Sequence, residues 1–240
     1  LIKGTNMPIL HHLNHSRSQR ILWLFTELGL DYDIQAHFRD ANTGLAPNSL
    51  KAVFDLGRSP VVALDDEAHT ILGESGAIVE YFAQTNPQAQ LTVKPIEPLF
   101  SQYLYWLHFA EGTMMPPLIA NLVLGKAKTK KKPFLIKAIA DKVIDAILNA
   151  YYAPNNEQNI AHVEKHLAQQ VAQGSDFFVG DRLTAVDFMM LFPLEAMVAN
   201  KPGSMPTHIL AYVNRMQQRP AYQQALQAGG EYNFGPKNAA

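Results

Sequence analysis

The chain has 240 residues, of which 48% are hydrophobic and 17% are charged, a composition typical of a globular protein with one large core or two modest ones. Its formal net charge of -1 provides no cationic excess, which argues against a nucleic-acid partner. It contains no cysteine, so it can form neither a disulfide nor a thiolate metal site, and any thiol chemistry must use the sulfur of a small molecule.

The sequence carries no sign of a membrane protein. Residues 1–6 lack the charged region and the long apolar stretch of a signal peptide. The most apolar stretch, residues 188–199, is interrupted by a proline and a glutamate and is shorter than the ~20 residues that span a bilayer. We therefore expect a cytoplasmic protein with no membrane partner.

The first part of the chain predicts a small α/β domain. An apolar segment over residues 8–13 indicates a strand, and Ile21 to Leu28 have helical spacing that stops at Gly29. A second strand over residues 32–37 completes a βαβ unit, whose two strands should be parallel. The further elements are a short helix, two strands that form a hairpin, and a helix, over residues 47–53, 61–64, 70–72 and 76–84.

The second part predicts helices and no strand. Residues 86–98 contain three prolines and indicate a linker. Apolar residues then recur at helical spacing in five segments, residues 99–124, 134–152, 157–173, 184–199 and 206–217. Five lysines between Lys126 and Lys132 indicate a solvated loop between two of these helices.

Polar residues from Asn14 to Arg20 follow the first strand, where the chain turns into the first helix. A hydroxyl there would lie among unpaired backbone N–H groups at the positive end of the helix dipole, a place that stabilises an anion. Serine is also a preferred helix cap, so position alone favours simple capping for Ser16 and Ser18.

Two motifs precede the third strand and the third helix. Ser59-Pro60 could be an ordinary strand edge or a cis bond in a tight turn. At Glu74-Ser75-Gly76, the hydroxyl and the free backbone N–H groups could hold a carboxylate while Glu74 takes an ammonium, which together would recognise an amino-acid head group. In isolation, the motifs favour a trans proline and a plain helix start.

The helical part offers three further patterns. Thr184 and Asp187 have the spacing of a capping box. His162 and His166 lie four apart on a predicted helix, but no third ligand is visible, so we expect a solvent-facing pair and no metal site. An aromatic and apolar stretch should be mostly buried, with one face free to line a pocket. The candidates for that face are Tyr105, His108, Phe109 and Met115.

Four segments together resemble the glutathione transferase superfamily, especially its bacterial and fungal members with a serine loop. They are HHLNHSRSQRILWLFTELGLDYDI, LGRSPVV, ESGAIVEYF and FFVGDRLTAVDFMM, and they extend the resemblance over nearly the whole chain from Met7. The resemblance implies a thioredoxin-like domain of order βαβαββα over residues 7–86, which binds glutathione. It also implies an all-helical domain over residues 96–240, which forms the electrophile pocket, and a homodimer.

The resemblance assigns a catalytic role to the serine loop. Ser16 would donate a hydrogen bond to the glutathione thiolate, with Ser18 as its competitor. Ser59-Pro60 would form a cis-proline turn whose backbone groups bind the cysteinyl part of glutathione.

The resemblance also assigns the two ends of glutathione. Glu74 and Ser75 would hold the γ-glutamyl end, and Arg58 and Lys51 are the candidates for the glycyl carboxylate. Phe54-Asp55 departs from the polar residue and proline that are usual near the glycyl end. Thr184 and Asp187 match the capping box that helps the helical domain to fold.

The implied activity is conjugation of the glutathione thiolate to small hydrophobic electrophiles, as in detoxification, with glutathione as cosubstrate and no metal. A thiol with a pKa of about 8.5 is mostly protonated at neutral pH, so the enzyme must favour the thiolate, through Ser16 and the helix dipole. Reduction of organic hydroperoxides and a non-catalytic binding module are the alternatives. The lack of a cysteine disfavours disulfide exchange.

Overall fold

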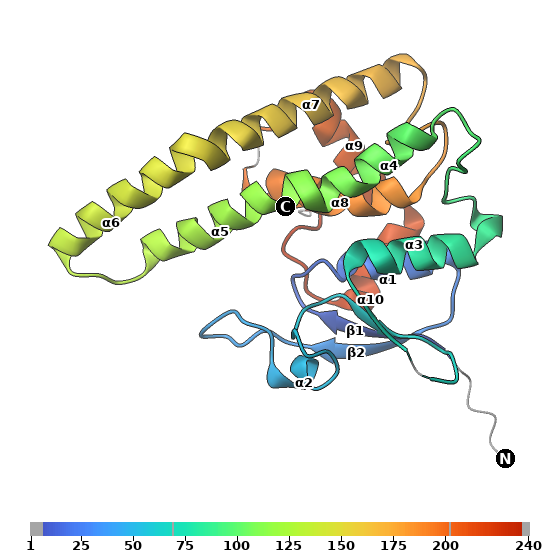
Figure 1. Cartoon of the computed structure of the whole chain (residues 1–240), viewed down its shortest axis with the longest axis horizontal. Coiled ribbons are helices and arrows are strands. Elements are labelled where there is room, and N and C mark those ends of the chain that lie inside the picture. The colour runs from blue at the N-terminus through green and yellow to red at the C-terminus, as the bar shows by residue number, and fades with distance from the viewer. Residues whose placement is uncertain (1–6, 69, 202, 237–240) are drawn as a thin grey trace.

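The computed structural model describes residues 7–68, 70–201 and 203–236, so residues 237–240 of the predicted helical domain lie outside it. A small mixed sheet with its helices is followed along the chain by a bundle of longer helices (Figure 1). The order βαβαββα is confirmed, and the fold is thioredoxin-like with an appended helical domain.

The sheet has four strands in the spatial order β2-β1-β3-β4. They are β1 (Ile9–Leu13), β2 (Asp33–His37), β3 (Val61–Ala63) and β4 (Ile71–Gly73). β1 is parallel to β2 and antiparallel to β3, and β4 is antiparallel to β3. Leu10 on β1 pairs with Ile34 and Val62, and both Leu10 and Val62 are fully buried. The predicted βαβ unit and hairpin are therefore both present.

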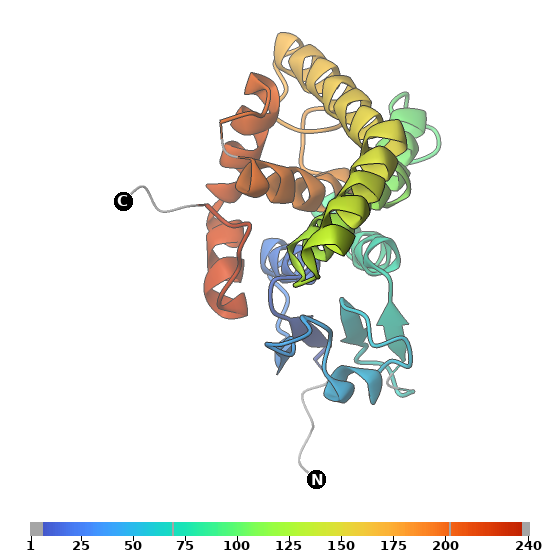
Figure 2. The same ribbon diagram turned by 90° about the vertical axis from the view of Figure 1, so that its left-hand side faces the viewer.

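Three helices belong to this part, α1 (Gln19–Leu28), the short α2 (Asn48–Lys51) and α3 (Ser75–Thr85). α1 and α3 lie between the sheet and the helical bundle (Figure 2). α1 ends at Gly29, as predicted, because that residue takes a left-handed conformation with φ of 64°, which glycine adopts without steric cost. Since α1 has neighbours on both sides, every residue from Gln19 to Phe25 is buried.

The helical part contains seven α-helices in its described residues. They are α4 (Phe100–Phe109), α5 (Met115–Thr129), α6 (Phe134–Ile147), α7 (Ala153–Ala172), α8 (Ala185–Asn200), α9 (Thr207–Gln217) and α10 (Pro220–Gly229). No strand occurs among the described residues of this part, as predicted. None of these helices, within the described residues, is long and apolar enough to cross a membrane.

Two pairs of helices, α4 with α5 and α6 with α7, are each continuous through an irregular turn. The sequence predicts no irregularity in the first pair and a break in the second. Wider π-helical turns at Ala110–Met114 and Leu148–Tyr152 join α4 to α5 and α6 to α7 (Figure 1). Each wide turn comes just before proline, at Pro116 and at Pro154, whose missing N–H disrupts the regular pattern. The break predicted between residues 152 and 157 is therefore wrong.

Two further helical features differ from the sequence prediction. The predicted lysine loop starts too early, because Lys126 to Thr129 are still part of α5. α10 was not predicted, and it packs beside α1 with Tyr222 edge-on to Trp23 at 5.8 Å between ring centroids. Gly229 permits this approach, since a Cβ there would lie 2.6 Å from Leu22 Cδ1. The apolar core thus runs from the sheet into the helices, and the domain boundaries at residues 86 and 96 stay predictions.

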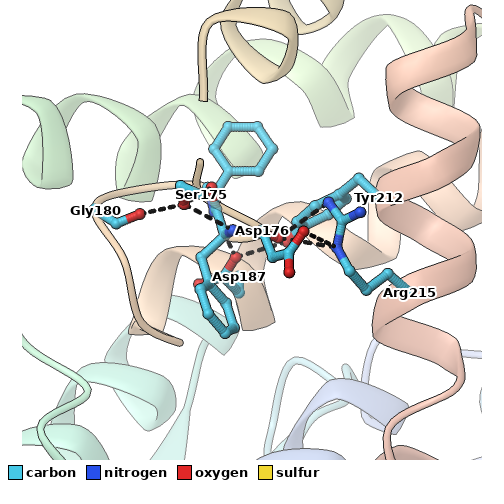
Figure 3. A network of polar contacts seen from close by, with 8 residues as sticks. Ser175, Asp176, Gly180, Asp187, Tyr212 and Arg215 are labelled. Carbon is cyan, nitrogen blue, oxygen red and sulfur yellow. Dashed lines mark hydrogen bonds and ion pairs between the residues drawn. The ribbon is translucent and has the colours of Figure 1, made fainter. Parts of the chain in front are cut away.

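The start of α8 is fixed by a buried acidic side chain. Thr184 and Asp187 form the capping box, and the Thr184 N–H donates to Asp187 Oδ2 at 2.8 Å. Asp187 Oδ1 accepts from the Phe178 N–H and the Tyr212 hydroxyl, both at 2.9 Å (Figure 3). Arg215 on α9 also donates to the carbonyl of Asp176. These contacts hold the loop before α8 against α9.

The predicted solvent-facing pair on α7 is wrong for one histidine. His166 is buried, and its Nε2 donates to the carbonyl of Phe178 at 2.7 Å. His162 is exposed, lies 3.0 Å from the Tyr105 hydroxyl and stacks on Trp106. Because the two histidines are four residues apart, they lie on the same side of α7, but the loop before α8 covers His166 alone.

Candidate active site

The serine loop between β1 and α1 contains a chain of short contacts. Ser18 Oγ lies 2.8 Å from His12 Nδ1, 2.9 Å from Ser16 Oγ and 3.2 Å from both the N–H and the carbonyl of Leu13. The Ser18 N–H in turn donates to Ser16 Oγ at 3.2 Å. A hydroxyl donates one hydrogen bond and accepts two, so the Ser18 hydroxyl is fully used within the protein.

The direction of this chain follows from His12. A backbone group of Gly229 acts to raise the pKa of His12, as a carbonyl that accepts from the ring does. We therefore assign the ring hydrogen to Nε2, so that Nδ1 accepts from Ser18. Burial lowers the pKa of His12 to about 4, which keeps the ring neutral at physiological pH. Ser16, by contrast, lines an open cleft. With the Ser18 hydrogen directed to His12, Ser16 is the donor in its 2.9 Å contact with Ser18 Oγ. Because Ser16 lines the cleft, its hydrogen can turn from Ser18 to a bound ligand, whereas the Ser18 hydrogen stays on His12.

Two arginines at the start of α1 share one carboxylate. Glu111, in the π-helical turn after α4, accepts from Arg17 Nη1 and Arg20 Nη1, each at 2.7 Å. Although burial acts to raise it, the two guanidinium groups hold the pKa of Glu111 below its usual value. Arg20 is buried against the Phe192 ring, whereas Arg17 lines the cleft. Sequence reasoning missed Arg17 because its partner is 94 residues away.

The residues predicted to bind glutathione converge beside this loop. Arg58, Ser59, Pro60, Glu74 and Ser75 line one small hollow, and Arg58 and Ser59 also line the cleft at Ser16. The Ser59–Pro60 peptide bond is cis.

The start of α3 has the properties of a ligand-binding position. Ser75 Oγ is buried and has no hydrogen-bond partner among the described residues, and an unpaired buried hydroxyl is costly unless a ligand or water completes it. Glu74 has a φ of 66°, a strained conformation for a residue with a side chain, of the kind that clusters at functional sites.

The predicted glycyl end is less complete. Lys51 is exposed on α2, beside Gly57, and lines neither hollow, whereas Arg58 lines both. Phe54, the residue that departs from the family pattern, packs over Gly73, where a Cβ would lie 2.8 Å from the Phe54 ring. Phe54 thereby closes one side of the small hollow. The structure brings Arg58 to the site and leaves Lys51 outside it.

The cleft at Ser16 is about 370 Å³ in volume and runs between the serine loop and the helical bundle. Its helical wall is apolar and comes from α5, α8 and the segment after α10. The wall residues include Met115, Leu118, Ile119, Phe192 and Phe234. Of the predicted pocket residues, Met115 lies in this cleft, whereas Tyr105, His108 and Phe109 line a separate, open depression.

Phe234 reaches the cleft because a buried carboxylate holds the segment after α10. Glu195 on α8 accepts hydrogen bonds from the hydroxyls of Tyr222 and Tyr232, and from Gln217 Nε2 at 3.2 Å. Gln217 also donates to the Phe234 carbonyl at 3.2 Å. Burial raises the pKa of Glu195 to about 7. Sequence reasoning missed Phe234. The signal that could have found it is the presence of two aromatic residues, Tyr232 and Phe234, in an otherwise polar segment.

In the part of the chain that the structure describes, no group of three or more His, Cys, Asp or Glu side chains is arranged to hold a metal ion. The cationic and hydroxyl groups around the cleft instead suit an anionic organic ligand.

Comparison with known proteins gives consistent matches. The families described as "Glutathione S-transferase, N-terminal domain" and "Glutathione S-transferase, C-terminal domain" match residues 16–85 and 125–228. Glutathione S-transferase 1 of Saccharomyces cerevisiae is 34% identical over 195 residues, which cover 79% of this chain and 81% of that protein. Glutathione S-transferase 3 of Schizosaccharomyces pombe is 30% identical over 217 residues, covering 90% and 85%. A crystal structure of a glutathione S-transferase from Actinobacillus pleuropneumoniae has a TM-score of 0.71 at 27% identity and covers 95% of this chain and 99% of that one.

Proposed function

Because the chain belongs to the glutathione S-transferase family, we propose that it conjugates the glutathione thiolate to small hydrophobic electrophiles. The observation that carries this proposal is the position of Ser16. Its hydroxyl lies just before α1, lines the cleft and can turn its hydrogen from Ser18 Oγ to a ligand. An anion placed there gains both a hydrogen bond and the field of the helix N-terminus.

The neighbouring residues support an oriented glutathione. The unpartnered Ser75 hydroxyl and the strained Glu74 would receive the carboxylate and the ammonium of the γ-glutamyl group. Ser59, before the cis-proline, would bind the cysteinyl part, and Arg58 the glycyl carboxylate. Because Arg58 and Ser59 line both hollows, a ligand gripped at Ser75 can extend to Ser16.

The proposed reaction needs ionisation and proximity. A hydrogen bond from Ser16 stabilises the thiolate more than the thiol, so it lowers the pKa of the bound thiol from its ordinary value of about 8.5. The apolar wall of Met115, Leu118 and Phe192 would hold an electrophile beside the sulfur, which replaces a bimolecular encounter with a positioned attack. The sulfur then bonds to the electrophilic carbon as the leaving group departs.

The family resemblance also supports proposals about the oligomeric state, the location and the biological role of the protein. We propose a homodimer, a cytoplasmic location and a role in detoxification.

The test is a titration of glutathione onto the protein with thiolate absorbance as the readout, followed by turnover assays with an aryl halide and an organic hydroperoxide in parallel. Binding with increased thiolate absorbance and turnover of the aryl halide is the expected result. Turnover of the hydroperoxide alone would replace conjugation with peroxidase activity. A protein that binds no glutathione would refute the proposal.

A further inference from the structure

A second hollow, of about 440 Å³, lies in the helical bundle between α5, α7 and the end of α8. Its walls include Leu118, Leu122, Ile160 and Met205, and Lys126 and Lys201 also line it. The proposed conjugation reaction makes no use of this hollow. It combines an apolar trough with two cations.

The second hollow adjoins the reaction cleft. Leu118, Leu122 and Asn200 line both, so the two spaces meet at these side chains. Along α5, Met115 lines only the cleft and Lys126 only the second hollow. A helical rise of about 1.5 Å per residue separates these two positions by about 16 Å. An elongated molecule could therefore have one end in each space.

Two of the five lysines between residues 126 and 132 are ion-paired, whereas Lys126, Lys130 and Lys131 have no ion pair with the described residues. Of these three, only Lys126 lines the second hollow. Lys128 pairs with Asp145 at 2.7 Å, and Lys132 pairs with Asp141 at 3.5 Å. Neither Lys126 nor Lys201 has an ion pair with the residues that the structure describes. Their charges are available to a ligand.

Lys126 also lies near the reaction cleft. A Cβ at position 44 would be 3.9 Å from its Nζ, and the next residues, Leu45 and Ala46, line the cleft. The amine therefore stands where the second hollow approaches the thioredoxin-like part. An apolar chain that ends in an anion complements this arrangement, because each part of it meets a matching surface.

We propose that the preferred electrophile is an elongated amphipathic anion. Its reactive carbon lies at Ser16, its apolar chain crosses Leu118 and Leu122, and its terminal carboxylate lies between Lys126 and Lys201. This assignment rests on the proposed conjugation. For an α,β-unsaturated ketone, the glutathione sulfur bonds to the β-carbon, the carbon–carbon π bond opens, and a proton from water completes the α-carbon.

The test compares three electrophiles with the same unsaturated ketone. One carries a long saturated chain ending in a carboxylate, the second is its methyl ester, and the third has a short alkyl chain. The ratio of kcat/KM for the acid to that for the ester should exceed one. In the double variant Lys126→Gln/Lys201→Gln this ratio should fall by about 2-fold to 25-fold, since an exposed ion pair of about 0.2–1 kcal/mol contributes at most about fivefold per lysine.

Lys131→Gln is the matched control, because Lys131 is an exposed lysine that lines neither hollow; it should leave the ratio unchanged. Equal kcat/KM for acid and ester in the unaltered protein, or an equal loss with both in the double variant, would overturn the proposed substrate class. Those results would leave conjugation intact as long as the short ketone is turned over. Failure with all three electrophiles would count against conjugation itself.

Discussion

Glu195 should make the stability of the protein depend on pH in a defined direction. The carboxyl group is buried and its pKa is raised from 4.5 to about 7 by burial, against the hydrogen bonds from Tyr222 and Tyr232. At about 1.36 kcal/mol per pH unit, this difference corresponds to about 3 kcal/mol. Because the folded pKa is the higher one, the stabilising contribution is fully present below pH 4.5 and is lost as the pH rises through about 7.

Glu195→Gln removes this titration while keeping the size of the side chain and its ability to accept a hydrogen bond. Urea unfolding of both proteins across this pH range gives the difference in unfolding free energy, wild type minus variant. That difference should decrease by about 3 kcal/mol as the pH rises, since the other titrating groups contribute equally to both proteins.

Glu157→Gln is the matched control, because Glu157 is exposed on α7, and it should show no comparable trend. A difference between wild type and Glu195→Gln that stays constant, or that increases with pH, would refute the reasoning about this buried carboxyl.

Two further predictions concern the small hollow at Ser75 and the cleft at Ser16. Ser75→Ala should weaken glutathione binding by about 10-fold or more, as measured by calorimetry, because it deletes an unpartnered buried hydroxyl whose bond to a carboxylate is worth about 1.5–3 kcal/mol; unchanged affinity would place the γ-glutamyl group elsewhere. Phe234→Ala should raise KM for an aromatic electrophile about fivefold, through loss of apolar contact of about 1 kcal/mol, and leave glutathione affinity unchanged; a loss of affinity for glutathione would contradict the assignment of Phe234 to the electrophile wall.

The sequence predicted the order of the elements because its signals were local. Period and turn residues, such as the stop at Gly29, specify where a strand or helix lies. The sequence-based prediction failed where a contact between residues far apart in the chain determines the local structure. The π-helical turn before Pro116 is one example. Pro117, four residues after Thr113, has no N–H to donate to the Thr113 carbonyl, and Asn159 on α7 donates to that carbonyl instead. α10 is another, because its place beside α1 depends on tertiary packing.

The candidate site divides in the same way. Arg58, Ser59, Glu74 and Ser75 meet in one hollow, as the family resemblance implied. The residues of the electrophile side depend on how the helices pack, which the sequence does not specify. Tyr105 is an aromatic residue of the kind that lines pockets, but it lines a different depression. The choice between Ser16 and Ser18 was open in the sequence, and the hydrogen-bond chain to His12 now favours Ser16.

The central claim is that Ser16 donates a hydrogen bond to the glutathione thiolate. The most direct measurement is the pKa of the bound glutathione thiol, from thiolate absorbance against pH, in the unaltered protein, Ser16→Ala and Ser18→Ala. Loss of a hydrogen bond to an anion, about 1.5–3 kcal/mol, should raise that pKa by about 1 to 2 in Ser16→Ala and much less in Ser18→Ala. An unchanged thiol pKa in Ser16→Ala, or a larger rise in Ser18→Ala, would contradict the account.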